Sequence, residues 1–100
     1  MFNNPRYLTK GFQSAVPLMT QFVLFHMIDH SKNTRKFDYL QVFTLSVESH
    51  GGQAVQKIVH SQEQPIWSKT SLFPLENPIT AKIYVIDDGD HHTFLLAEEC

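Results

Sequence analysis

The sequence predicts an α+β fold, with one main helix packed on a mostly antiparallel sheet of five to six strands. Two observations indicate this class. One long apolar-rich segment lies in the N-terminal third, and the later segments are short, rich in β-branched and aromatic residues, and separated by glycines and prolines. The expected order of elements is β-α-β-β-β-β-β, and 100 residues suffice for a single domain, residues 1–100, with one core.

The helix is expected over residues 16–31. Pro17 suits its first turn, where a backbone N–H is not needed. Apolar residues occupy every side of the helix, so one sheet cannot cover them all. We expect a second surface, either loops of the same chain or a second copy of the protein, to cover Val23, Leu24 and Met27.

The strands are recognised by the alternation of apolar and polar residues along them and by the glycines and prolines that end them. Residues 37–47 alternate, with Gln41 as the one polar residue on the apolar face, while Leu40 and Val42 leave the other face partly apolar. The strands expected before the last hairpin are residues 6–11, as a short edge strand, and residues 37–47, 54–60 and 66–73.

The strongest local signal is a β-hairpin within residues 81–99. Its strands are β-branched or aromatic, and Asp88-Gly89 accepts the positive φ of a tight turn. Opposed residues share a face, so parity assigns every strand residue to one side of the sheet. The inner face is expected to hold Ile83, Val85, Phe94 and Leu96, and the outer face, open to a partner, Tyr84, Ile86, Thr93 and Leu95.

Composition and charge restrict the class of protein. The chain has a net charge of −2, and its only cysteine is Cys100, so no internal disulfide forms. The apolar segment is too short to cross a bilayer, and no signal peptide is evident at the start. Residues 1–36 carry five basic residues and one acidic residue, whereas residues 37–100 carry three and nine. A cytoplasmic location without membrane association is expected.

Four segments together resemble one protein family. Residues 6–11, 38–43, 58–65 and 83–88 are similar to the small bacterial family catalogued as domain of unknown function 960. The resemblance spans nearly the whole chain and implies a compact cytoplasmic bacterial protein. It implies no catalytic or binding residue, because the family has no assigned activity.

The tip of the last hairpin, residues 87–92, offers a candidate metal site. Carboxylate and imidazole donors of this kind suit Zn²⁺ or Mn²⁺. The alternative is a solvated turn, because adjacent residues on a tight turn point in different directions. The candidate ligands are Asp88, Asp90, His91 and His92, together with Asp87.

The other motifs give weaker support for a catalytic or binding function than the hairpin tip does. His26 and His30 have the i,i+4 spacing of a zinc site but lack the intervening glutamate of the metalloprotease motif. No nucleophile elbow or phosphate-binding loop is present, so no motif supports an enzyme. Weak nucleic-acid binding is a further alternative, and a pI near 6.3 opposes it. Its candidate residues are Arg6, Lys10, Lys32, Arg35 and Lys36.

The function favoured by these observations is a non-catalytic protein-interaction module that self-associates as a homodimer, without a cofactor. Tryptophan is enriched at interaction hot spots, and the polar segment 58–67 ends in the only tryptophan of the chain. The interaction candidates are Val23, Leu24, Met27, Trp67 and Tyr84. The alternative functions are a metal-dependent activity at the hairpin tip and nucleic-acid binding through the basic N-terminal third.

Overall fold

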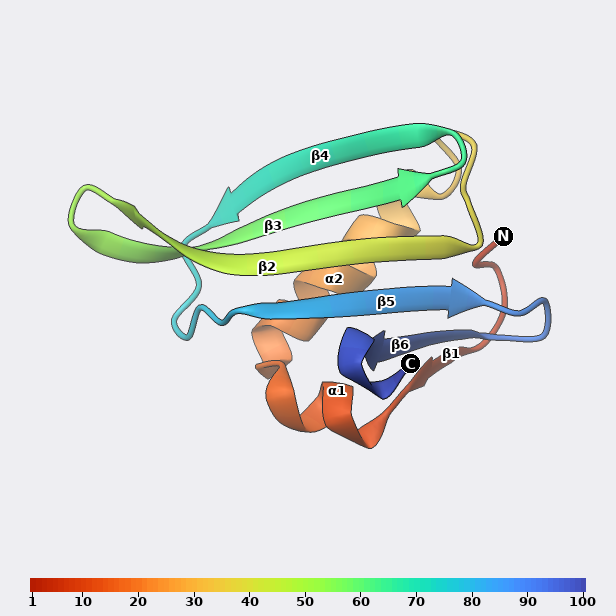
Figure 1. The fold of residues 1–100 in the computed structure, drawn as a ribbon, viewed down its shortest axis with the longest axis horizontal. Coiled ribbons are helices and arrows are strands. Elements are labelled where there is room, and N and C mark those ends of the chain that lie inside the picture. The colour runs from red at the N-terminus through yellow and green to blue at the C-terminus, as the bar shows by residue number, and fades with distance from the viewer.

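The computed structural model describes all 100 residues as one six-stranded sheet with helices behind it (Figure 1). The helical elements are α1 (Lys10–Ala15), α2 (Leu18–Ser31) and the 3₁₀ turn η1 (Ala97–Glu99). The strands are β1 (Arg6–Leu8), β2 (Leu40–His50), β3 (Gln53–Glu63), β4 (Ile66–Phe73), β5 (Ala81–Asp87) and β6 (His92–Leu96). Their order in the sheet is β1-β6-β5-β2-β3-β4, so the α+β class is confirmed.

The predicted, mostly antiparallel sheet is confirmed in part, because the sheet is mixed. Four pairings are antiparallel, but β1 pairs with β6 in parallel, with Tyr7 opposite Thr93. No hairpin turn joins these two strands, because nearly the whole chain separates them. Local turn residues therefore carry no information about their relative direction.

The predicted order of elements also lacks one helix. The strand expected over residues 6–11 ends at Leu8, and α1 follows it. Thr9 is the N-cap of α1, because its side-chain oxygen accepts a hydrogen bond from the Phe12 N–H at 3.1 Å. A threonine before a short helical stretch is a recognised start signal, so this error was avoidable.

Helix α2 crosses the covered face of the sheet and presents one side to the core. Leu24 and Ile28, one turn apart, are fully buried. The expectation that Leu24 lies at a surface for a partner is therefore wrong, while Val23 and Met27 are half-buried against the core. The exposed apolar residues of α2 are Leu18, Met19 and Phe22.

The core lies between α1, α2 and the inner face of the sheet. The predicted parity of the last hairpin is confirmed, since Val85 is opposite Phe94 and Ile83 is opposite Leu96. The buried apolar residues that the strands contribute are Phe43, Leu45, Ile58, Ile83, Val85 and Phe94.

The hairpin of β2 and β3 extends beyond the helices (Figure 1). Gly51 and Gly52 form its turn with φ of 59° and 82°. Strand β2 begins three residues later than predicted, so Tyr39 precedes it and is 54% exposed, and Val47 is 48% exposed where no helix covers it.

The inner face is tested by replacing Val85 with aspartate. Because Val85 is fully buried among apolar residues, Val85→Asp should leave an unpaired charge in the core and lower the free energy of unfolding by about 3 kcal/mol or more. Urea unfolding followed by circular dichroism measures the loss. Asp90→Asn at the exposed tip is the control and should cost about 0.5 kcal/mol or less. Equal losses would contradict the assigned faces.

Candidate functional site

Asp87, the first residue of the predicted metal site, fastens the N-terminal segment to the sheet. Its Oδ2 accepts the Phe2 backbone N–H at 2.6 Å, and its Oδ1 accepts the Gly89 N–H at 2.8 Å and the Asn4 amide at 3.0 Å. Burial opposes the charged form, but these hydrogen bonds outweigh it and lower the pKa of Asp87. Asp87 is therefore an ionised anchor whose two oxygens are already used.

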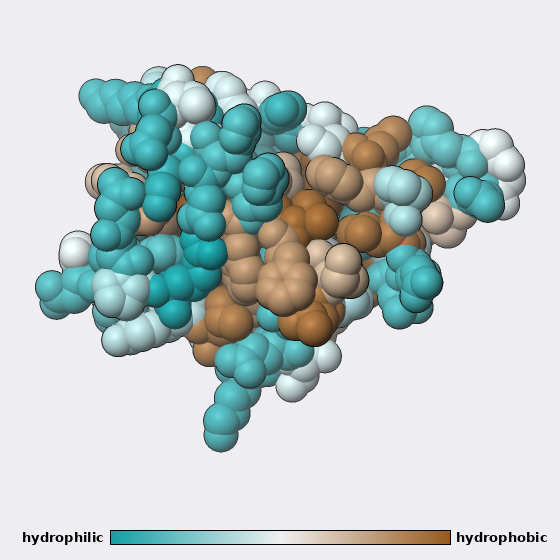
Figure 2. Space-filling view, turned by 180° about the vertical axis from the view of Figure 1, so that it is seen from behind, coloured by the Kyte–Doolittle hydropathy of each residue, from teal (hydrophilic) through white to brown (hydrophobic).

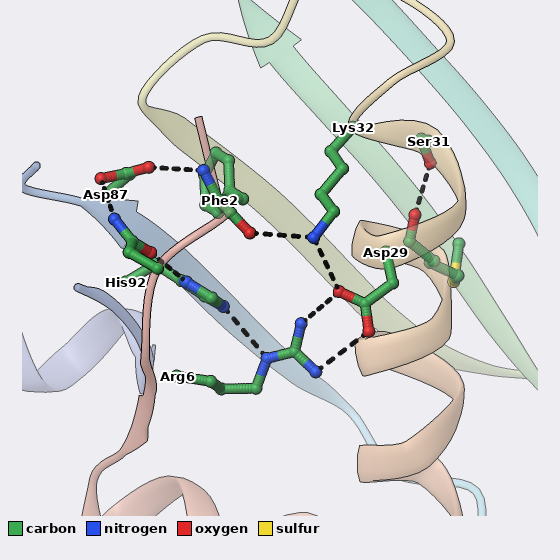
Figure 3. A network of polar contacts seen from close by, with 9 residues as sticks. Phe2, Arg6, Asp29, Ser31, Lys32, Asp87 and His92 are labelled. Atoms are coloured by element: carbon green, nitrogen blue, oxygen red, sulfur yellow. Dashed lines mark hydrogen bonds and ion pairs between the residues drawn. The ribbon is translucent and has the colours of Figure 1, made fainter.

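His92 continues the same network on β6 (Figure 3). Arg6 Nε donates to His92 Nε2 at 3.0 Å, so the ring proton lies on Nδ1, which donates to Asn4 Oδ1 at 2.7 Å. Burial, and then the charge of Arg6, lowers the pKa of His92. The imidazole is thus a neutral link between β1 and the N-terminal segment.

The network ends on α2, where Arg6 and Lys32 share Asp29. The Arg6 fork holds both carboxylate oxygens, with Nη2 at 2.5 Å and Nη1 at 3.3 Å, and Lys32 Nζ also donates to the Phe2 carbonyl at 3.1 Å (Figure 3). Burial opposes ionisation of Asp29, but the Arg6 hydrogen bond and the nearby cations lower its pKa overall. We call this network the N-terminal clasp: Phe2, Asn4, Arg6, Asp29, Lys32, Asp87 and His92.

The clasp separates the predicted metal ligands. His92 is directed inward, while at the outer tip the His91 ring lies 3.1 Å from the carboxylate of Asp88. The other Asp88 oxygen accepts the backbone N–H groups of Asp90 and His91, both at 3.1 Å. No group of three or more histidine, cysteine, aspartate or glutamate side chains in the structure could hold a metal ion.

The basic residues of the N-terminal third do not form one surface. Arg6 and Lys32 are paired with Asp29 in the clasp, and Arg35 is covered by aromatic rings. Only Lys10 and Lys36 are exposed. The structure therefore brings no basic face together from these five residues.

A cleft of about 690 Å³ lies between the C-terminal half of α2 and strand β4. Figure 2 shows this side of the molecule, with apolar surface gathered at its centre. His26 and His30 stack at 5.6 Å between ring centroids on the helix wall. No carboxylate is present among the residues that line the cleft: His26, Met27, His30, Ser31, Thr34, Arg35, His60, Trp67, Lys69, Ser71 and Phe73.

A chain of hydrogen bonds runs beneath the cleft from His60 to Arg35. Gln41 donates from Nε2 to Gln62 Oε1 at 2.9 Å, so its own oxygen accepts a hydrogen bond from His60 Nε2 at 2.7 Å. Gln62 Oε1 also accepts Arg35 Nη1 at 2.7 Å. Gln41, predicted only as a polar interruption of an apolar face, is therefore the centre of a buried network.

His60 is kept neutral by its surroundings. Burial, and then the positive charge of Arg35, lowers the pKa of His60 from 6.5 to about 3. A neutral ring with its proton on Nε2 fits the single hydrogen bond to Gln41. His60 thus acts as a structural donor at neutral pH.

Arg35 lies between two aromatic rings at the edge of the cleft. Its guanidinium carbon is 3.3 Å from the centre of the Trp67 ring and 4.3 Å from that of Phe37. Its Nε and Nη2 atoms are buried without a hydrogen-bond partner, and no carboxylate pairs with it. Trp67, predicted as an interaction residue, is thus half-buried against this cation.

The uncovered face of the sheet holds a second candidate surface. Register places Leu40 opposite Ile86, Val42 opposite Tyr84, and Tyr84 opposite Leu95, so two apolar sets predicted separately are one contiguous group. No helix covers this face (Figure 1). We call it the open-face patch, and its half-buried residues are Leu40, Val42, Tyr84, Ile86 and Leu95.

Fold and sites together define a small two-layer α+β protein whose sheet is covered on one face. The chain belongs to the DUF960 family, described as "Staphylococcal protein of unknown function", whose profile matches residues 5–99, so the resemblance in the sequence is confirmed. None of the curated proteins matches the chain. No helix is long and apolar enough to span a membrane.

A crystal structure of a protein of unknown function from Enterococcus faecalis shares this fold. It matches with a TM-score of 0.79 and 22% identity, over 98% of this chain and 92% of that chain. At this identity the similarity concerns the fold alone.

The state of His60 predicts how stability depends on pH. Between pH 6.5 and about 3 the unfolded chain binds a proton at this residue and the folded protein does not, so stability falls as the pH falls. From pH 7 to pH 5 His60 should account for a loss of about 2 kcal/mol. Urea unfolding at both pH values should show that His60→Gln, which keeps a donor for Gln41, removes this part of the loss. An unchanged pH dependence in the variant would contradict a neutral His60.

Proposed function

We propose that the protein is a non-catalytic interaction module that self-associates as a two-fold dimer through the open face of its sheet. The observation that carries this proposal is the open-face patch, whose five apolar residues lie side by side on β2, β5 and β6. A contiguous apolar group on a sheet face that no helix covers is typical of an interaction surface. The buried position of Leu24 moves the proposed interface from α2 to the sheet.

The size of the face suits a dimer. Six strands about 4.8 Å apart and about eight residues long present a projected area of roughly 600 Å². Protruding side chains make the accessible area larger, close to the roughly 800 Å² per partner of a standard interface. The energetic gain comes from the apolar centre, because each Å² of apolar surface removed from water contributes about 25 cal/mol.

The arrangement of charge favours a second copy as the partner. On the open face Lys57 and Lys82 lie beside Ser46 and Thr44 of β2, with Glu48 beyond Lys57, whereas Glu63 ends β3 and Asp88 follows β5. A two-fold axis in the interface, perpendicular to the strands, reverses the strand direction and brings the two lysines of each copy towards the two carboxylates, those of Glu63 and Asp88, of the other. The same reversal superimposes the two apolar centres.

The first prediction concerns mass in solution. Light scattering after size exclusion should give about twice the monomer mass of 11.6 kDa at tens of micromolar protein. Tyr84→Glu at the centre of the patch should shift the protein to monomer without unfolding it, because Tyr84 is on the open face. Met19→Glu, on the exposed side of α2 where the residue is 64% exposed, is the control and should leave the dimer intact. A wild-type monomer, or dissociation by Met19→Glu alone, would overturn the proposal.

A charge swap tests the proposed orientation. Lys57→Glu should weaken the dimer, because two acidic groups then meet at each end of the interface. The double variant Lys57→Glu, Glu63→Lys should restore the wild-type dissociation constant, measured by analytical ultracentrifugation. Failure of the double variant to recover affinity would rule out the reversed strand arrangement.

A further inference from the structure

We propose that the cleft between α2 and β4 is a binding site for a small organic anion whose carboxylate or phosphate group pairs with Arg35. This site lies on the covered side of the sheet, opposite the open-face patch, so it is independent of the proposed dimer. The shared chemistry of the ligand is an oxyanion that presents two oxygens to a guanidinium group.

The first argument is the missing counter-charge of Arg35. Two other partly buried cations, Arg6 and Lys32, contact Asp29, whereas Arg35, like the half-buried Lys57 on the open face, meets no carboxylate. Its one hydrogen bond, from Nη1, goes to the neutral amide of Gln62. Removing a cation from water without a partner is costly, so the structure favours an anion beside Arg35.

The second argument is the geometry of the free donors. Nε and Nη2 are the two Arg35 nitrogens without a partner, and together they form one edge of the guanidinium fork. This edge is the one that binds a carboxylate or phosphate through two parallel hydrogen bonds. Nη1, the nitrogen on the other side, is already held by Gln62 and fixes the orientation of the fork.

The third argument is the charge of the walls. Lys69 on β4 adds a second cation, and no residue that lines the cleft is acidic. Three carbonyl groups near the C-terminal end of α2 are engaged. Those of Met27, Ile28 and Ser31 accept hydrogen bonds from the Ser31 hydroxyl, the Lys32 N–H and Thr34, respectively. The charge of the side chains that line the cleft therefore favours an anion.

The cleft also suits the organic part of a small ligand. Its volume of about 690 Å³ lies within the usual range of small-molecule sites, and Met27, Trp67 and Phe73 supply apolar walls. The Trp67 ring stacks on Arg35, and the free donor edge is closed to solvent. An anion that pairs with Arg35 changes the surroundings of the stacked indole, which makes Trp67 a reporter of binding.

Intrinsic fluorescence tests the site directly, because Trp67 is the only tryptophan in the chain. Inorganic phosphate and succinate are titrated separately, with sodium chloride holding the ionic strength constant. A saturable change in Trp67 emission with at least one of the two is expected. Saturation with phosphate alone identifies a phosphate ester as the ligand class, and saturation with succinate alone identifies a carboxylate. No saturable change with either anion overturns the proposal.

Matched variants assign the binding to Arg35 and Lys69. Arg35→Gln should weaken binding about tenfold or more, and the exposed Lys69→Gln should weaken it severalfold while leaving the fold intact. Lys82→Gln removes the same charge from the open face and should bind as the wild type does. If Arg35→Gln does not fold, Lys69→Gln decides the test. Equal affinities of wild type, Lys69→Gln and Lys82→Gln would show that the cleft does not hold the anion.

Discussion

The structure depends on the hydrogen bonding of polar side chains that lie on the covered face of the sheet. Eight of the 20 buried residues are polar, and a buried polar group is tolerated only when it has partners. Buried glutamine side chains satisfy this requirement by hydrogen bonding to the backbone of loops. Gln56 exchanges hydrogen bonds with both backbone groups of Ile79 in the loop between β4 and β5, and Gln21 donates to the Val16 carbonyl between the two helices. Gln62 donates to the Lys36 carbonyl ahead of β2. The polar residues therefore position the loops around the apolar core.

The two ends of this polar layer differ in how charge is compensated. In the N-terminal clasp both cations contact Asp29, Asp87 accepts hydrogen bonds from backbone and amide groups, and neutral His92 links Arg6 to Asn4. Under the cleft, the chain through Gln41 and Gln62 is neutral and ends on a cation without a carboxylate. The N-terminal clasp has a structural role, because its charged groups find partners within the protein. The end under the cleft is the place in the fold where an external anion improves the electrostatics. Covered and open faces thus hold two different surfaces, a polar cleft and an apolar patch.

Much of the fold could be predicted from local patterns in the sequence. Residue parity assigned the last hairpin to its two faces correctly, because opposed side chains in a sheet share a face whatever covers them. The α2 segment was also recognised, because its apolar residues are nearly continuous, and strand β4 was recognised because Pro65 and Pro74 flank it. The candidate site was harder to predict from the sequence. Trp67 was singled out as an interaction residue. Arg35 was named only among the basic residues considered for nucleic-acid binding, and Gln41 only as a polar residue on an apolar face, because the sequence does not show the partners of either residue.

By itself, then, the sequence determined most of the elements and the face on which most strand residues lie, because both follow from interactions between near neighbours in the chain. Only the tertiary structure decided which side of α2 is buried, since its apolar residues surround the helix and the position of the sheet makes the choice. It also decided that β1 is parallel to β6 and that Asp87 and His92 are directed towards the N-terminal segment. Those contacts join residues more than 80 positions apart. Their geometry is set by the packing of the whole chain, which no local pattern encodes.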